Sequence, residues 1–158
     1  MPYIKQFFSG GAYSVRGFPA FSLGPGTYSP PESEKALFFL QQGGEIKLEL
    51  NAEYRFPIYS MVKGGVFADA GNVWLNQENS LVPGGKLTHS FYKELAASVG
   101  LGLRTDVQFF VLRLDLGIPV RKPWFPEHNR WAFNKFKLED GTWRKENLLL
   151  NVAFGYPF

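Results

Sequence analysis

The chain has 158 residues with a net charge of +3, of which 17% are aromatic and 20% charged, and it includes 17 glycines and 11 prolines. A small and scattered positive charge argues against a nucleic-acid-binding protein, and the lack of cysteine excludes disulfide scaffolds and thiol chemistry. The sequence has no apolar run of roughly 18 residues that would predict a membrane-spanning helix, whereas its aromatic and glycine content is typical of β structure with interfacial side chains.

Residues 1–44 show no regular alternation and are predicted to form one long connection. Their most distinctive stretch runs from Ser9 to Phe18 and contains the sequence Val15-Arg16-Gly17-Phe18. An isolated arginine in a loop is usually solvated, so this stretch alone is compatible with an ordinary surface loop.

The segment Glu45–Phe56 alternates between apolar and polar residues along its whole length. Because successive side chains of a strand point to opposite faces, this period predicts a strand with one apolar and one charged face, whereas a helix would scatter both kinds around its circumference. The polar face comprises Glu45, Lys47, Glu49, Asn51, Glu53 and Arg55.

Four later segments repeat this alternation and are predicted to be strands. Each has roughly the 9–11 residues that a tilted strand needs to cross a bilayer. They are Lys63–Trp74, Glu94–Arg104, Phe109–Pro119 and Asn147–Phe158, and charged residues on their polar faces include Asp69, Arg104, Arg113 and Asp115.

The connections alternate between short and long. Pro57–Val62 and Thr105–Gln108 are short, whereas Leu75–Lys93 and Val120–Glu146 are long, polar and rich in Gly, Pro and Trp. Outer-membrane barrels have short periplasmic turns and long extracellular loops, so we interpret the long connections as extracellular. Aromatic residues gather at the predicted strand ends, as in the two girdles of a membrane barrel: Tyr54, Phe56, Phe109, Tyr156 and Phe158 at one end, and Trp74, Phe91 and Tyr92 at the other.

A soluble lipocalin-like barrel or sandwich would also alternate and is the main structural alternative. Its apolar face would point inward, and its charged face would meet solvent. The charges of this chain suit either solvent or a wide wet lumen, while the connection lengths and the terminal aromatic residue favour the membrane barrel.

The motifs resemble those of one family, the BamA/TamA (bacterial surface antigen) superfamily. Ser9–Phe18 with Leu23–Gly26 resembles its V-R-G-F/Y loop, and Gly65–Trp74 resembles its F-x-D-x-G strand. Asn51–Pro57 resembles the strand between these motifs, and Asn151–Phe158 resembles the C-terminal sorting signal. The motifs occur in the expected order across nearly the whole chain, and a TamA-type member is the best match.

The resemblance implies that the long loop folds into the lumen and that its arginine pairs with acidic residues of the inner wall. Strand parity independently places Asp69 and Glu53 on the inner face. A guanidinium can bridge two carboxylates, so we predict a contact between Arg16 and Asp69 with Glu53 as second acceptor. The predicted loop-to-wall lock also includes Gly17, Phe18, Phe67 and Gly71.

The last strand carries Phe154, Tyr156 and Phe158 on its lipid-facing side. The resemblance implies that assembly machinery reads this sorting signal by pairing with the exposed strand edge. The simpler alternative is that these rings anchor the strand at the membrane interface, and both roles are compatible.

The expected fold is an all-β antiparallel transmembrane barrel. Five strands cannot close a membrane barrel, because open edges would leave backbone groups unsatisfied in lipid. The family has sixteen strands preceded by POTRA domains. We therefore expect residues 1–158 to be the C-terminal portion of such a barrel, with the loop at 1–44 and five strands at 45–158, and expect the missing signal peptide to lie upstream.

The expected function is a noncatalytic outer-membrane protein assembly, insertion or translocation factor in the bacterial outer membrane. The expected partners are outer-membrane lipid, client β-barrel proteins and the outer-membrane assembly machinery, with a periplasm-spanning protein as a further candidate and no nucleic acid. His89 and His128 lie in connections without a ligand pattern, so no metal or cofactor is expected. Alternatives are a two-partner secretion translocator and the barrel anchor of a surface enzyme such as a phospholipase.

Overall fold

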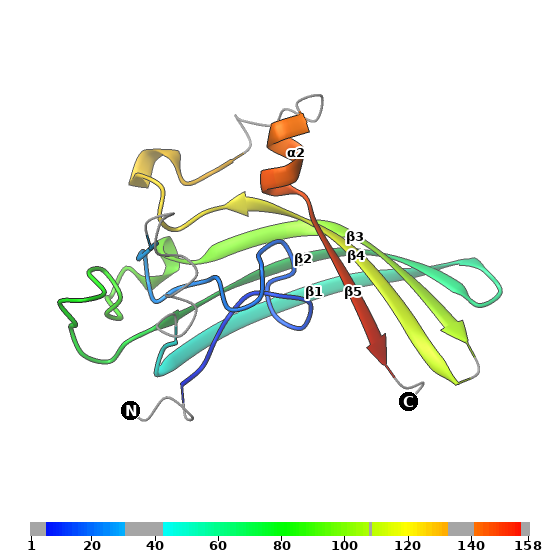
Figure 1. Cartoon of the computed structure of the whole chain (residues 1–158), viewed down its shortest axis with the longest axis horizontal. Helices are drawn as coiled ribbons and strands as arrows, with labels where there is room; N and C mark the ends of the chain where they lie inside the picture. The colour runs from blue at the N-terminus through cyan, green and yellow to red at the C-terminus, as the bar shows by residue number, and fades with distance from the viewer. Residues whose placement is uncertain (1–5, 31–42, 108, 133–140, 156–158) are drawn as a thin grey trace.

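The computed structural model describes residues 6–30, 43–107, 109–132 and 141–155. Five strands form one antiparallel sheet in chain order, each hydrogen-bonded to the next (Figure 1). They are β1 (Ile46–Tyr59), β2 (Val62–Trp74), β3 (Ala96–Val107), β4 (Phe110–Arg121) and β5 (Leu149–Gly155). The prediction of five antiparallel strands from period-2 alternation is therefore confirmed.

The β1–β2 connection is shorter than predicted from the sequence. Strand pairing continues through Pro57↔Lys63 to Tyr59↔Val62, so only Ser60 and Met61 remain in the turn. The ladder shifts register between Pro57 and Tyr59, and such an irregularity accommodates a proline that cannot donate a ladder hydrogen bond. Likewise, β3 continues to Val107 through residues that the sequence had suggested for a turn.

The start of the last strand was also predicted wrongly. Asn147, the predicted first residue of this strand, belongs instead to a short helix, α2 (Gly141–Asn147), and β5 begins only at Leu149. The helical hydrogen bond from Leu148 N to Arg144 O and the bond from Asn147 Nδ2 to Trp143 O hold this turn. Residues 156–158 lie outside the described part of the chain. The long connections also contain two single-turn 3-10 helices, η3 (Phe91–Lys93) and η4 (Glu127–Asn129).

The two faces of the sheet differ as the alternation predicts. On the outer face the side chains are apolar and uncovered, with exposed fractions of 61% for Leu101, 62% for Leu150 and 68% for Phe154. The opposite face carries polar residues, of which Asp69, Ser98 and Asp115 are buried. Within the described ranges, no helix has the length and apolar character needed to cross a bilayer.

Trp74 departs from its predicted place in an exposed aromatic girdle. Its side chain is buried, its Nε1 donates to Glu94 Oε2 at 2.7 Å, and the ring of Phe91 packs edge-on against it. β2 extends beyond its last pair with β3, Gly71↔Ala96, and Phe91 and Glu94 of the following connection contact its end. Tyr54 and Phe109 are exposed, as predicted for girdle residues.

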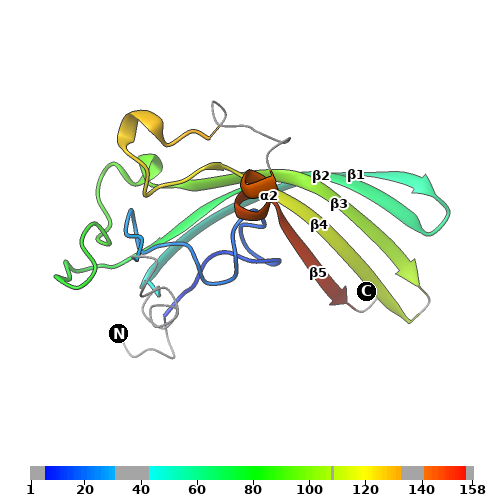
Figure 2. The same ribbon diagram turned by 45° about the horizontal axis from the view of Figure 1, so that its top comes forward.

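The sheet is twisted and curved, and residues 6–30 lie against its concave side (Figure 2). We call residues 6–30 the inward segment. The two short turns lie at one end of the sheet and the long connections at the other (Figure 1). A small core forms between the inward segment and the sheet from Val15, Phe18, Leu23 and Ala96, with Trp124 packed against it. The fold thus brings the loop motif to the polar face.

Candidate functional site: an arginine of the inward segment held by the sheet

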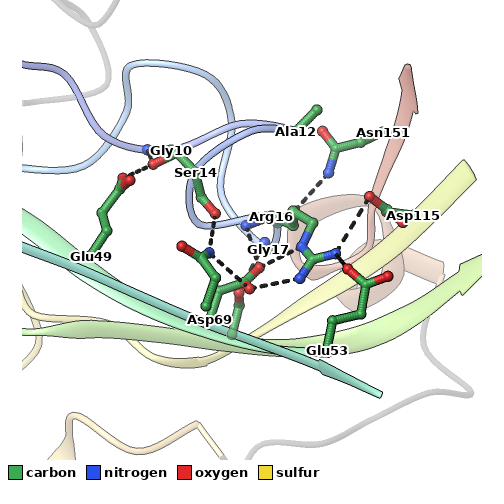
Figure 3. A network of polar contacts seen from close by, with 12 residues as sticks. Gly10, Ala12, Ser14, Arg16, Gly17, Glu49, Glu53, Asp69, Asp115 and Asn151 are labelled. Carbon is green, nitrogen blue, oxygen red and sulfur yellow. Dashed lines mark hydrogen bonds and ion pairs between the residues drawn. The ribbon is translucent and has the colours of Figure 1, made fainter. Parts of the chain in front are cut away.

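Arg16 belongs to the inward segment and is only 5% exposed. Its side chain lies between the backbone of that segment and the sheet. Its Nε and Nη2 donate parallel hydrogen bonds to Asp69 Oδ2 and Oδ1, each at 2.8 Å. The backbone N–H of Arg16 also donates to Asp69 Oδ2 at 3.1 Å (Figure 3). Asp69 therefore binds both the side chain and the main chain of the segment, and the two parallel side-chain bonds depend on the planar guanidinium fork.

Glu53 is the second acceptor of the Arg16 guanidinium. Arg16 Nη1 donates to Glu53 Oε2 at 2.8 Å. Glu53 Oε1 is also 2.9 Å from Arg55 Nε and 2.7 Å from Arg104 Nη2. One carboxylate on β1 is thus shared by three arginines, which ties the inward segment to β1 and β3 at once.

A third carboxylate lies beside the pair. Asp115 Oδ2 is 3.8 Å from Arg16 Nη1 (Figure 3). The same oxygen is 2.8 Å from Arg113 Nε. Asp115 is 1% exposed, so its charge needs these cations to remain stable in a poorly solvated site.

The aromatic ring of Phe67 completes the surroundings of the guanidinium. Arg16 Cζ lies 3.7 Å from the ring centroid, within the range of a cation–π interaction. Burial alone would lower the pKa of Arg16, but its hydrogen bonds to Asp69 and Glu53 outweigh burial and leave that pKa raised. Arg16 therefore stays positively charged, and the site works as a fixed electrostatic clamp.

Gly17 allows the segment to approach the wall closely. A Cβ at this position would overlap Ser98 Cβ and meet the backbone where Ile118 joins Pro119. The Gly17 N–H donates to Ser98 Oγ at 3.1 Å. Gly117 of β4 is matched to this contact, because a Cβ there would meet the backbone of Arg16 and Gly17. Small residues on both sides are thus required for the guanidinium to reach its carboxylates.

Further hydrogen bonds hold the segment on either side of Arg16. Asn51 Nδ2 donates to Ser14 O at 2.8 Å and to Asp69 Oδ1 at 3.0 Å. Asn151 Nδ2 on β5 donates to Arg16 O at 2.7 Å. Ser9 Oγ donates to Glu49 Oε1 at 3.0 Å, the Ser14 hydroxyl also bonds to Glu49, and Arg113 Nη2 donates to Ala12 O. Strands β1, β2, β4 and β5 all contribute to this network.

The structure brings most of the predicted lock residues together. Arg16, Asp69, Glu53, Gly17 and Phe67 form one cluster. Gly71 lies next to it, since a Cβ there would come within 2.9 Å of Glu49 Cγ and 3.1 Å of Val15 Cγ2. Phe18 belongs to the adjoining apolar core and meets Trp124 edge-on at a ring distance of 6.0 Å. Phe154 is exposed on the outer face, and Tyr156 and Phe158 lie outside the described residues.

Four further site residues were not predicted from the sequence: Asp115, Asn51, Ser98 and Asn151. All four lie on the polar face of their strands, so parity selects them as candidates. Their convergence depends on strand register, which pairs Asn51 with Asp69, Asp69 with Ser98, and Asp115 with Asn151.

The cluster holds the inward segment against the sheet. Its members are guanidinium, carboxylate, amide and ring groups engaged with one another. In the part of the chain that the structure describes, no group of three or more His, Cys, Asp or Glu side chains is arranged to bind a metal ion.

A curved antiparallel sheet that is apolar outside and polar inside, with a glycine-rich segment tethered to its inner face, is characteristic of a membrane-barrel wall. Residues 1–135 match the family model of the Omp85 superfamily domain. The chain therefore belongs to the Omp85 superfamily, and it is a protein of the bacterial outer membrane.

The chain is similar in sequence to one BamA protein and in fold to another. The chain is 29% identical over 152 residues to the outer membrane protein assembly factor BamA of Neisseria meningitidis serogroup B, an alignment covering 84% of this chain and 18% of that protein. Its fold is similar to the crystal structure of BamA from Haemophilus ducreyi lacking POTRA domains 1–3, with a TM-score of 0.53 and 18% identity over 98% of this chain and 28% of that one. The chain thus spans less than a third of either relative.

Proposed function

We propose that this chain is part of the barrel of an outer-membrane protein assembly factor. The single observation that carries the proposal is the clamp of Arg16 by Asp69 and Glu53, which fixes the inward segment to the polar face of a sheet of the Omp85 superfamily. The relationship to BamA of Neisseria meningitidis supports the assembly role. The complete protein would close a sixteen-stranded barrel, of which the sheet β1–β5 is the C-terminal part.

The proposed role is noncatalytic and rests on strand pairing. A weak seam between the first and last strands of the barrel would open and template incoming client strands. The inward segment would hold the wall next to the last strand, because Asn151 of β5 binds Arg16 directly. The partners would be lipid, client barrel proteins and the assembly machinery.

The finer assignment within the family is also a proposal. The motifs favoured a TamA-type member, but the sequence relative is BamA of Neisseria meningitidis, which supports a BamA-like role instead. A periplasm-spanning protein stays a further candidate partner.

The test is a reconstitution in proteoliposomes of the complete protein that contains this chain. Membrane insertion of an unfolded client barrel should accelerate in its presence, and the Asp69→Ala variant should lose most of this acceleration. Arg144→Lys, an exposed change in α2, is the matched control. If the unaltered protein does not accelerate insertion but exports a soluble substrate across the same vesicles, a secretion role would replace the assembly role.

A further inference from the structure

Three neighbouring strands place cations directly opposite one another near the short-turn end of the sheet. The register pairs Lys63 of β2 with Arg104 of β3, and Arg104 with Arg113 of β4. We call these three residues the cation row. Like charges directly opposite in a sheet are destabilising, so the row needs compensation from nearby anions.

Resident carboxylates compensate the row only in part. Lys63 Nζ is 2.6 Å from Asp106 Oδ2. Arg104 is paired with Glu53, and Arg113 is paired with Asp115. Both of these carboxylates also face Arg16. Arg104 Nε is buried without a hydrogen-bond partner among the described residues. Around the row, five cations therefore meet four carboxylates: Arg16, Arg55, Lys63, Arg104 and Arg113 against Glu53, Asp69, Asp106 and Asp115.

A cavity of about 470 Å³ lies over the row. Its lining includes the three cations together with the apolar or aromatic side chains of Tyr13 and Val111. The Lys63 side chain is 49% exposed, whereas those of Arg104 and Arg113 are mostly buried. Lys63 is thus the part of the row that a ligand from solvent meets first, and Tyr13 of the inward segment forms one wall.

We propose that the cation row binds an extended acidic segment of another polypeptide. Adjacent strands are about 4.8 Å apart, so the row spans about 10 Å, and alternate residues of an extended chain place their side chains about 6.7 Å apart on one side. Two carboxylates in an alternating sequence can therefore reach two of the three cations at once, while the intervening apolar side chains point away from the row. A single compact phosphate cannot contact all three cations across this width.

The cavity lies at the end of the sheet that carries the short turns, which places it on the periplasmic side of the membrane. That the acidic segment comes from a client chain entering the barrel rests on the proposed function. Binding itself is measured without any assembly activity, so the two proposals fail separately.

The test is fluorescence anisotropy with the complete protein in detergent and a labelled peptide that alternates Glu and Val. The matched probe alternates Gln and Val. We expect the Glu peptide to bind at least about tenfold more tightly at low salt, with the difference shrinking as salt screens the charges. Lys63→Gln should weaken binding about fivefold, Lys63→Arg should restore it, and Lys86→Gln, the same change on an exposed connection, should leave it unaltered.

Equal binding of the Glu and Gln peptides would overturn the inference, as would full affinity in Lys63→Gln. Displacement of the Glu peptide by an equal concentration of inorganic phosphate would identify a phosphate site instead. Lys63→Arg keeps a cation in the same place, so its recovered affinity separates a charge effect from misfolding of the Gln variant.

Discussion

Arg16 and Asp69 are 53 positions apart in the chain, yet they share two parallel hydrogen bonds of 2.8 Å each. The same carboxylate oxygen that accepts from Arg16 Nε also accepts from the backbone N–H of Arg16. Asp69 thus fixes the side chain and the main chain of the inward segment together, and changes at either residue are expected to release the whole segment rather than one contact.

Replacing Arg16 by Lys keeps the charge but removes the planar fork. An ammonium group cannot satisfy both oxygens of Asp69 and also reach Glu53, which leaves buried carboxylate oxygens unpaired. We expect a loss of about 3 kcal/mol in the free energy of docking, read as faster proteolysis within residues 6–30 of the folded protein. The Arg144→Lys variant, changed at an exposed residue of α2, should be cleaved at the same rate as the unaltered protein. Equal protection of the Arg16→Lys variant would contradict the role of the fork.

Adding a methyl group at Gly17 tests the close approach of the segment to the wall. The new Cβ would overlap Ser98 and the β4 backbone, so we expect Gly17→Ala to lift the segment and destabilise it by about 1–3 kcal/mol. Thermal unfolding in detergent gives the readout. Gly155→Ala is a matched control, because a Cβ at Gly155 meets no atom within 4 Å. Similar melting temperatures for both variants would argue against steric matching at Gly17.

Phe67 contributes a ring face to the guanidinium, 3.7 Å from Arg16 Cζ. Phe67→Leu keeps an apolar side chain but removes the cation–π interaction, so we expect a loss of about 1–2 kcal/mol in stability. Phe109→Leu, at a ring that is 80% exposed, should change the same measurement little. A double-mutant cycle with Arg16→Gln, which removes the cation, should show coupling, and simple additivity of the two changes would rule the interaction out.

Trp124 connects the last long connection to the inward segment through its edge-on contact with Phe18. Trp124→Leu should loosen this apolar core and raise hydrogen exchange in both residues 15–23 and the connection after β4. We expect a loss of about 1–2 kcal/mol, since aromatic pairs add to the area that they bury. Trp131→Leu serves as a comparison, because Trp131 is 55% exposed. Increased exchange confined to the connection would show that the contact does not couple the two segments.

The sheet was predictable from the sequence because alternation is a local property. In Glu45–Phe56 the alternation of apolar and polar residues assigns each residue to one of the two faces. Parity alone placed Asp69 and Glu53 on the inner side. Asp115 and Asn151 share that parity, but their convergence on Arg16 depends on the register of strands that are distant in sequence. The polar face of each strand therefore identifies the candidate site residues, and the register of the strands determines which of them contact one another.

The misplaced elements have tertiary causes. Trp74 was assigned to an exposed girdle by its position at a strand end, yet Glu94 and Phe91 of the following connection cover it. Helix α2 is seven residues long and begins with Gly141, so it carried no periodic signal. The turn at Pro57 was placed too early because strand pairing runs past the proline through a register shift.

The hydrogen bond from Asn151 to Arg16 O joins residues 135 positions apart. Contacts between such distant positions form late, because the chain must first close a large loop. The hydrogen bond from Asn151 to Arg16 O therefore forms only after β5 has been added. We expect protection of residues 6–30 in a pulse-labelling experiment to rise in two steps, first with β1–β3 and then with the pairing of β5, because β5 adds its own bond to a segment that the earlier strands already hold.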